Sequence, residues 1–77
     1  MTKAVVNLNE LRKLNMFVND MCTFVADIDA VRGRYVIDAR SIMGMISLDL
    51  STPLDIVINS DDEAEINRFL EVTKRYQ

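Results

Sequence analysis

The sequence contains no histidine, and this absence excludes more chemistry than any other feature of the chain. Histidine is the side chain that most often acts as acid or base near neutral pH, and it is the commonest metal ligand. Without an imidazole, the chain cannot carry a phosphoryl group on a histidine nitrogen. We therefore expect a protein that is not an enzyme and that holds neither a metal ion nor a cofactor.

Cysteine, proline and glycine are also scarce, with one, one and two residues respectively. The single cysteine, Cys22, allows no internal disulfide and no cysteine metal cluster, which favours a reducing, cytoplasmic location. We expect Cys22 to be buried and inert, because a free cysteine packs as a small hydrophobe. The first residues lack the apolar stretch of a signal peptide, and no run reaches membrane-spanning length.

The chain also lacks a large net charge of either sign. The net charge is −3 over 77 residues, of which 49% are hydrophobic and 27% charged. This composition is typical of one small globular domain, here residues 1–77. Nucleic acids and anionic membranes favour basic surfaces, so neither is expected as a partner. We expect protein partners, and a monomer or a weak homodimer.

Alternation of apolar residues predicts four β-strands. Residues 25–31 and 35–39 alternate on either side of a turn at residues 32–34, which indicates a β-hairpin. Residues 3–6 form a strand at or near a sheet edge, and residues 54–58 form the fourth strand. The side chains expected to face inward are Ala26, Ile28, Ala30, Tyr35, Ile37, Ala39, Leu54, Ile56 and Ile58.

Helical spacing predicts three helices. Asn7 or Asn9 can cap the first, Ser41 precedes a short second helix, and Ser60 stands in capping position for the third. The inward face of the first helix is expected to be Leu11, Leu14, Val18, Met21 and Cys22, and that of the third Ile66, Phe69, Leu70 and Thr73. Met16 and Phe17 lie off the centre of the inward stripe of the first helix, and Met16 points well away from it, towards solvent or a partner.

Strands with one wet face need helices to cover the other face. The order of elements is strand, helix, strand, strand, short helix, strand, helix. We therefore predict an α+β open-faced β-sandwich, with a four-stranded antiparallel sheet and all helices on one side.

The segment Ser41-Ile42-Met43-Gly44-Met45-Ile46-Ser47-Leu48 resembles the regulatory-serine segment of HPr, the phosphocarrier of the bacterial sugar phosphotransferase system. The resemblance covers nearly the whole chain, with a shortened loop before the last helix. It implies the family's βαββαβα sandwich, a cytoplasmic location and phosphotransferase-system enzymes as partners.

The site at the start of the first helix departs from this family. HPr carries its phosphoryl group on a histidine that is followed two residues later by an arginine. In the present sequence Glu10 stands at the histidine position, Arg12 matches the arginine, and Lys13 replaces a usual proline. Three interpretations of Glu10 stay open: an acyl-phosphate carrier, a helix-start acid paired with Arg12 or Lys13, or a fixed negative charge that imitates a phosphorylated carrier.

Ser41 is the residue for which the resemblance implies a regulatory role. The matching serine of the family is phosphorylated by an ATP-dependent kinase/phosphorylase, and the product acts as corepressor for a catabolite control regulator. A phosphate there would add charge at the start of the short helix. The alternative is that the Ser41 hydroxyl only caps this helix. Arg40, beside it, is expected to be a solvated charge at the end of a strand.

An apolar docking surface is expected beside this site. The resemblance assigns partner binding to the first and short helices, and the candidate residues are Met16, Ile42, Met43, Met45 and Ile46. The leading hypothesis is an HPr-like regulatory protein of catabolite repression, which binds proteins but cannot carry phosphohistidine. The alternatives are a structural interaction module without phosphorylation and a phosphocarrier that uses Glu10.

Overall fold

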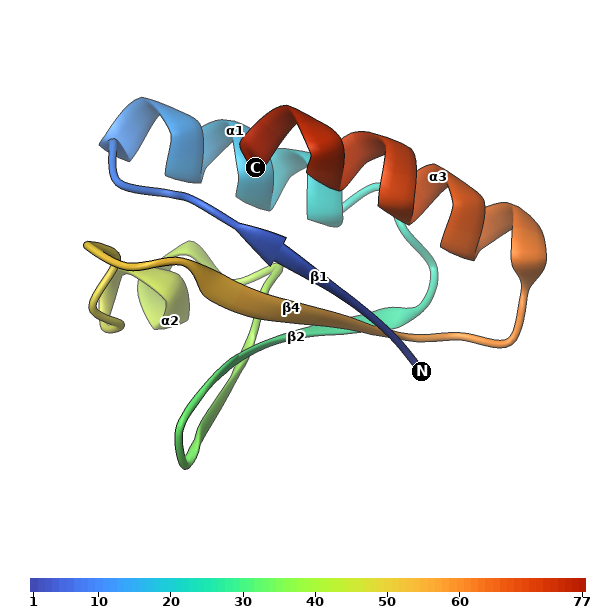
Figure 1. Ribbon diagram of the computed structural model, residues 1–77, viewed down its shortest axis with the longest axis horizontal. Coiled ribbons are helices and arrows are strands. Elements are labelled where there is room, and N and C mark those ends of the chain that lie inside the picture. The colour runs from blue at the N-terminus through green and yellow to red at the C-terminus, as the bar shows by residue number, and fades with distance from the viewer.

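The computed structural model describes residues 1–77 and contains one four-stranded sheet with three helices. The strands are β1 (Thr2–Val6), β2 (Asp27–Arg32), β3 (Tyr35–Asp38) and β4 (Leu54–Asn59), all antiparallel in the order β1-β4-β2-β3. The helices are α1 (Leu11–Met21), α2 (Ile42–Ile46) and α3 (Glu63–Thr73), and a 3₁₀ turn, η1 (Lys74–Tyr76), follows α3. Figure 1 shows α1 and α3 on the same side of the sheet. The predicted α+β open-faced sandwich is confirmed.

The inward face of the sheet is built on its two central strands. Leu54, Ile56 and Ile58 of β4 are almost fully buried, as alternation predicted. Ile56 pairs with Ala4 of β1 on one side and with Ala30 of β2 on the other. Small alanines beside a large isoleucine leave room for helix side chains to pack on this face, which places the core between the sheet and the helices.

Helix α1 meets the core through a stripe that differs from the predicted one. Its buried residues are Leu14, Phe17, Val18 and Met21. Phe17 was expected off the centre of this stripe, but it is fully buried. Leu11 was expected on it, but the side chain is 65% exposed. The buried Leu8, in the segment before the helix, fills the core ahead of α1, and the helix therefore begins with Leu11 already at the surface.

The caps of the two long helices also differ from the prediction. Neither Asn7 nor Asn9 caps α1; the cap position is held by Glu10, whose side chain makes no capping hydrogen bond. Asp62, rather than Ser60, caps α3, and its carboxylate accepts a hydrogen bond from the backbone N–H of Ala64 at 3.0 Å. The Ser60 hydroxyl instead accepts from the N–H of Asp62 and so shapes the turn before the helix.

Strand β3 is shorter and more exposed than predicted. The strand ends at Asp38, and the following Ala39 is buried while its N–H donates to the carbonyl of Ile28 at 2.8 Å. Tyr35 was expected to face inward into the core, but it is 68% exposed. Figure 1 shows the reason, because the hairpin of β2 and β3 projects beyond the helices that cover the rest of the sheet. Gly33, with φ of +58°, supplies the left-handed conformation of its turn.

Two residues of α3 tie this helix to the segment that precedes β2. The Glu65 carboxylate accepts hydrogen bonds from the backbone N–H groups of Val25 and Ala26, at 3.0 and 3.1 Å. The Arg68 guanidinium lies 3.8 Å from the centre of the Phe24 ring and donates to the hydroxyl and carbonyl of Thr23. The Ala26 N–H, with Arg68 and the Val25 N–H, lowers the pKa of Glu65 below its usual range. We call this group of contacts the polar clamp.

The inward face of α3 is narrower than predicted. Phe69 and Thr73 are fully buried, whereas Leu70 remains 38% exposed and Ile66 is partly buried. Beyond α3, Tyr76 packs edge-on against Phe17 of α1, with ring centres 5.2 Å apart, so the last turn is joined to the first helix. None of these helices has the length and apolar character needed to cross a membrane.

Candidate functional site at α1 and α2

The start of α1 presents Glu10 to solvent. The backbone of this residue is extended, and its carbonyl accepts the first helical hydrogen bond from the N–H of Leu14 at 3.0 Å. The expected ion pair with Arg12 or Lys13 is absent from the structure. The Glu10 carboxylate and the exposed Arg12 guanidinium are therefore both available for contacts outside the chain.

Ser41 occupies the predicted capping position of α2. Its hydroxyl oxygen accepts a hydrogen bond from the N–H of Gly44 at 3.3 Å, and its carbonyl accepts from Met45 at 3.0 Å. The Ser41 N–H donates to the carbonyl of Asp38, so the end of β3 fixes where α2 begins. The Ser41 residue is only partly buried, and its hydroxyl lies at the junction between sheet and helix.

Arg40 is not the free, solvated charge that was expected. Its guanidinium forms ion pairs with Asp27 at 2.8 Å and Asp38 at 3.2 Å, and only 29% of the side chain is exposed. The Arg40 backbone N–H also donates to Asp38, and this bond together with the guanidinium lowers the pKa of the Asp38 carboxyl. Arg40 therefore braces the junction before α2.

Cys22 was expected to be buried, but it lies at the exposed end of α1. The helix ends at Met21, and Cys22 follows it at the C-cap position. Its thiol lies 3.6 Å from the carbonyl oxygen of Arg40. Spacing alone placed Cys22 on the buried stripe, because it carried no signal for where the helix stops.

Gly44 allows α2 to lie against β3. A Cβ atom at this position would lie 2.6 Å from the Cγ2 atom of Ile37, closer than two carbon atoms can approach. The absence of a side chain at residue 44 is therefore required by packing, not by an unusual backbone conformation. Ile37, half-buried on β3, forms the floor under this helix.

The predicted docking residues divide into two groups in the structure. Met16, Met43 and Ile46 are 53%, 77% and 51% exposed, as a binding surface requires. Met45 was predicted to belong to this surface, but it is fully buried. At 100° per residue Met45 lies on the opposite side of α2 from Met43, and it anchors the helix to the core. Ile42, on the same side as Met45, is partly buried against the core.

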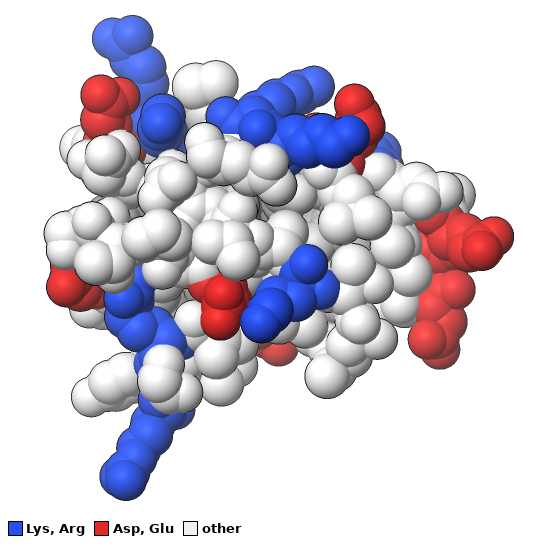
Figure 2. All heavy atoms as spheres, in the orientation of Figure 1, with Lys and Arg blue, Asp and Glu red and all other residues white.

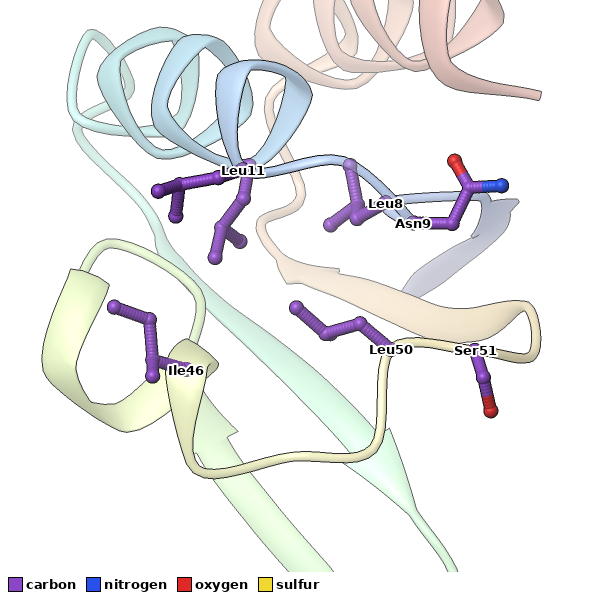
Figure 3. A pocket seen from close by; sticks show the side chains of 7 residues that line it. Leu8, Asn9, Leu11, Ile46, Leu50 and Ser51 are labelled. Atoms are coloured by element: carbon purple, nitrogen blue, oxygen red, sulfur yellow. The ribbon is translucent and has the colours of Figure 1, made fainter.

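An apolar groove runs between the start of α1 and the end of α2. Figure 3 shows Leu11 and Ile46 facing each other across it, with Leu8 and Leu50 beside them. The complete lining is Leu8, Asn9, Leu11, Leu14, Ile46, Leu50 and Ser51. Sequence reasoning identified Ile46 but did not assign Leu11 or Leu50 to a surface. We call the exposed residues Leu11, Met16, Met43 and Ile46 the α1–α2 surface.

Charged side chains lie beside this groove at the start of α1, where Glu10 and Arg12 are exposed, and also gather in clusters away from it. Figure 2 shows acidic side chains clustered where α3 begins and basic side chains over the end of α3 and at the tip of the hairpin. The acidic residues at the start of α3 are Asp61, Asp62 and Glu63. The basic residues are Lys74 and Arg75 after α3, and Arg32 and Arg34 in the hairpin. The α1–α2 surface itself consists of apolar residues, which favours burial against another protein.

Solved structures with the same arrangement are phosphocarrier proteins. HPr of Bacillus anthracis superimposes with a TM-score of 0.78 and 24% identity over 99% of this chain and 96% of its own. The fold is that of HPr. HPr-C-His of Thermoanaerobacter tengcongensis gives a TM-score of 0.75 and 21% identity, over 96% of this chain and 92% of that one.

A third similar structure is Crh, the catabolite repression containing protein of Bacillus subtilis. It matches with a TM-score of 0.68 and 22% identity, over 100% of this chain and 91% of its own. That protein is described as an intertwined dimer with a swapped domain. No protein-family model matches the sequence, and no curated protein does. The HPr-like fold predicted from the resemblance is therefore confirmed by structure rather than by sequence similarity.

Proposed function

We propose that this protein is a regulatory member of the HPr family, which binds other proteins and does not relay phosphate through histidine. The HPr-like fold over nearly the whole chain supports the relationship. The absence of histidine excludes the nitrogen–phosphorus chemistry of a phosphohistidine carrier. Its proposed location is the cytoplasm, where phosphotransferase-system enzymes act.

The observation that carries the proposal is the position of Ser41 beside exposed apolar residues. The partly exposed hydroxyl begins α2, and the same short helix presents Met43 and Ile46 to solvent. Transfer of a phosphoryl group from ATP would replace the hydroxyl proton and add about two negative charges at neutral pH. The modification would therefore change the charge of an otherwise apolar surface, and a partner that binds there would read the change.

The proposed partners are a serine kinase/phosphorylase, a catabolite control regulator and enzymes of the phosphotransferase system. Glu10 and Arg12 lie at the start of α1, near the groove, and no ion pair within the chain occupies either of them. We propose that Glu10 gives this site a permanent negative charge, which partly imitates a phosphorylated carrier. A carboxylate has one charge where a phosphoryl group has nearly two, so the imitation is incomplete.

The test is to incubate the protein with an HPr serine kinase and ATP and to measure the intact mass. We expect the wild type to gain one phosphoryl group and Ser41→Ala to gain none. Ser47→Ala is the matched control, because Ser47 is an exposed serine at the other end of α2, and this variant should be modified like the wild type. Modification that persists in Ser41→Ala, or no modification of the wild type, would contradict the proposed regulation.

A structural interaction module without phosphorylation is the second candidate. The observation that favours it is the hydrogen bond from the Gly44 N–H to the Ser41 hydroxyl, which gives this serine a structural role without any kinase. Binding to a catabolite control regulator separates the two. In the proposed function, Ser41-phosphorylated protein binds more tightly than unmodified protein, and Met43→Glu weakens binding. Equal affinity with and without phosphate would favour the module.

A further inference from the structure

The outer edge of β3, a strand of four residues, is an open edge of the sheet. β3 is the last strand in the order β1-β4-β2-β3, so one side of Tyr35–Asp38 pairs with no strand. Sheet edges are usually blunted by lysine, proline or a covering element, because free backbone groups recruit other strands. The segment Tyr-Val-Ile-Asp contains neither lysine nor proline, and Val36 is 61% exposed. Helix α2 lies against one face of β3, but no strand pairs with its outer edge, and the hairpin projects from the rest of the sheet (Figure 1).

The hydrogen-bond pattern identifies which backbone groups are free. Ala39 donates to Ile28, so Ala39 and, by alternation, Ile37 and Tyr35 direct their backbone groups towards β2. Val36 and Asp38 therefore direct theirs outward, away from the sheet. The Asp38 carbonyl is already bonded to Ser41, which leaves the Asp38 N–H and both groups of Val36 for a further strand.

We infer that a second copy of this chain pairs with this edge, β3 against β3 in antiparallel orientation, with Val36 on the two-fold axis. In that register Val36 lies opposite Val36, and Arg34, in the turn before β3 of each copy, comes beside Asp38 at the end of β3 of the other. Shifting the axis to Ile37 also matches the outward groups, but it moves Arg34 past the end of β3, towards Arg40 in the following turn. Opposite charges across strands are favourable and like charges are not, so the charges select the register centred on Val36.

The inward side of the same edge offers an apolar complement. A hollow beside β3 is lined by Tyr35, Ile37, Ser47, Leu48 and Asp49. In the register centred on Val36, Tyr35 of one copy lies opposite Ile37 of the other, on the face that bears this hollow. The largely exposed Tyr35 ring can therefore be buried against the Ile37 and Leu48 side chains of the second copy. Backbone pairing, two charge pairs and two aromatic contacts all favour the same occupant.

The other edge of the sheet does not offer these features. β1 carries Lys3 at its exposed side, where its ammonium lies 4.0 Å from the carboxylate of Asp55. At the end of this strand the N–H of Asn7 is already bonded to the carbonyl of Tyr76. β1 thus carries the lysine that commonly protects natural edge strands, whereas β3 has none and leaves both backbone groups of Val36 free.

Sedimentation velocity over a concentration series tests the inference. We expect a reversible, concentration-dependent dimer, and we expect Val36→Lys to weaken its association at least about tenfold. Val5→Lys is the matched control, because it adds the same charge to an exposed valine on the opposite edge strand, and it should leave association unchanged. A monomer at all concentrations overturns the inference, as does a dimer that Val5→Lys weakens and Val36→Lys does not.

Charge exchange tests the register. In Arg34→Asp the self-dimer would bring four acidic residues together, and in Asp38→Arg four basic ones, so each variant alone should be monomeric. An equimolar mixture restores both opposite-charge pairs in a mixed dimer and should regain association. Failure of the mixture to associate, with circular dichroism showing both variants folded, overturns the register. If Asp38→Arg does not fold, the comparison of Val36→Lys with Val5→Lys still decides whether this edge is used.

Discussion

The two ends of the helical layer are held to the sheet in different ways. At the polar clamp, Glu65 and Arg68 of α3 satisfy backbone groups before β2 through charge-assisted hydrogen bonds. At the other end Met45 and the partly buried Ile42 hold α2 to the core, and Arg40 braces the junction before it. Met43 and Ile46 of the same helix are left exposed. The first end leaves Val25 exposed, whereas the second leaves two apolar side chains of one short helix exposed beside the groove. This difference supports the proposed binding at the α2 end.

The largest effect is expected from Met45→Ala. This substitution removes the side chain that anchors α2 to the core, and it should lower the free energy of unfolding by about 2–5 kcal/mol. Met43→Ala is the matched control on the same helix, and because Met43 is exposed the change should stay within about 0.5 kcal/mol. Urea denaturation measures both. Equal losses for the two methionines would show that the two sides of α2 are not distinct.

Gly44→Ala is expected to have the next largest effect. The added Cβ would meet Ile37 at 2.6 Å, so α2 must shift away from β3. Overpacking of this kind costs about 1–3 kcal/mol. The double variant Gly44→Ala/Ile37→Ala removes the methyl group that clashes. It should lose less stability than the two single variants combined, and simple additivity in denaturation would contradict the close approach.

Ser41→Ala removes the cap of α2. The Gly44 N–H loses its side-chain acceptor, and we expect a loss of about 0.5–2 kcal/mol in the free energy of unfolding. Ser60→Ala is a useful comparison, because Ser60 precedes α3 without capping it, and its loss should be smaller. A negligible effect of Ser41→Ala would mean that packing alone positions the α2 end.

The stabilising effect of the polar clamp can be tested by measuring stability as a function of pH. The pKa of Glu65 is lower in the folded protein than in the unfolded chain, so its stabilising effect is complete above its ordinary pKa, about 4.3. That contribution is lost as the pH falls through the lower, folded value. When the pH is lowered from neutral to acidic, the free energy of unfolding should therefore fall less in Glu65→Gln than in the wild type. Glu71→Gln, at an exposed carboxylate on the same helix, should follow the wild-type profile in thermal unfolding.

The smallest effect is expected from Arg12→Ala. The Arg12 guanidinium is exposed and forms no ion pair, so stability should change by less than about 0.5 kcal/mol. Lys13→Ala provides a comparison at the next position. If calorimetry showed a much larger loss for Arg12→Ala, this side chain would be part of the folded framework rather than free for a partner.

The sequence predicted the strands and the layers because period-two alternation depends only on local geometry. Leu54, Ile56 and Ile58 were assigned to the core correctly for that reason. It also predicted Ser41 as the cap of α2, since a serine before a short apolar run has few other local roles. These features need no knowledge of which segments meet in space.

The errors occur where tertiary contacts decide the outcome. Leu8 fills the core before α1 begins. The cap position is therefore Glu10 rather than an asparagine, and Leu11 lies at the surface. Tyr35 is exposed because its hairpin extends past the helices, which no local pattern could indicate. Cys22 was expected to be buried and is exposed, and Met45 was expected on a binding surface and is buried. Both errors have the same cause, because the end of a helix and the side that it buries depend on the elements that pack against it.

The uncapped start of α1 has a consequence for recognition. Since Glu10 supplies no side-chain acceptor, the first N–H groups of the helix must be satisfied by water or by a visiting ligand. Leu11, in this first turn, lines the groove, so the free N–H groups lie next to its apolar wall. A partner segment that fills the groove can therefore place a polar oxygen on the helix start and an apolar side chain against Leu11 at the same time.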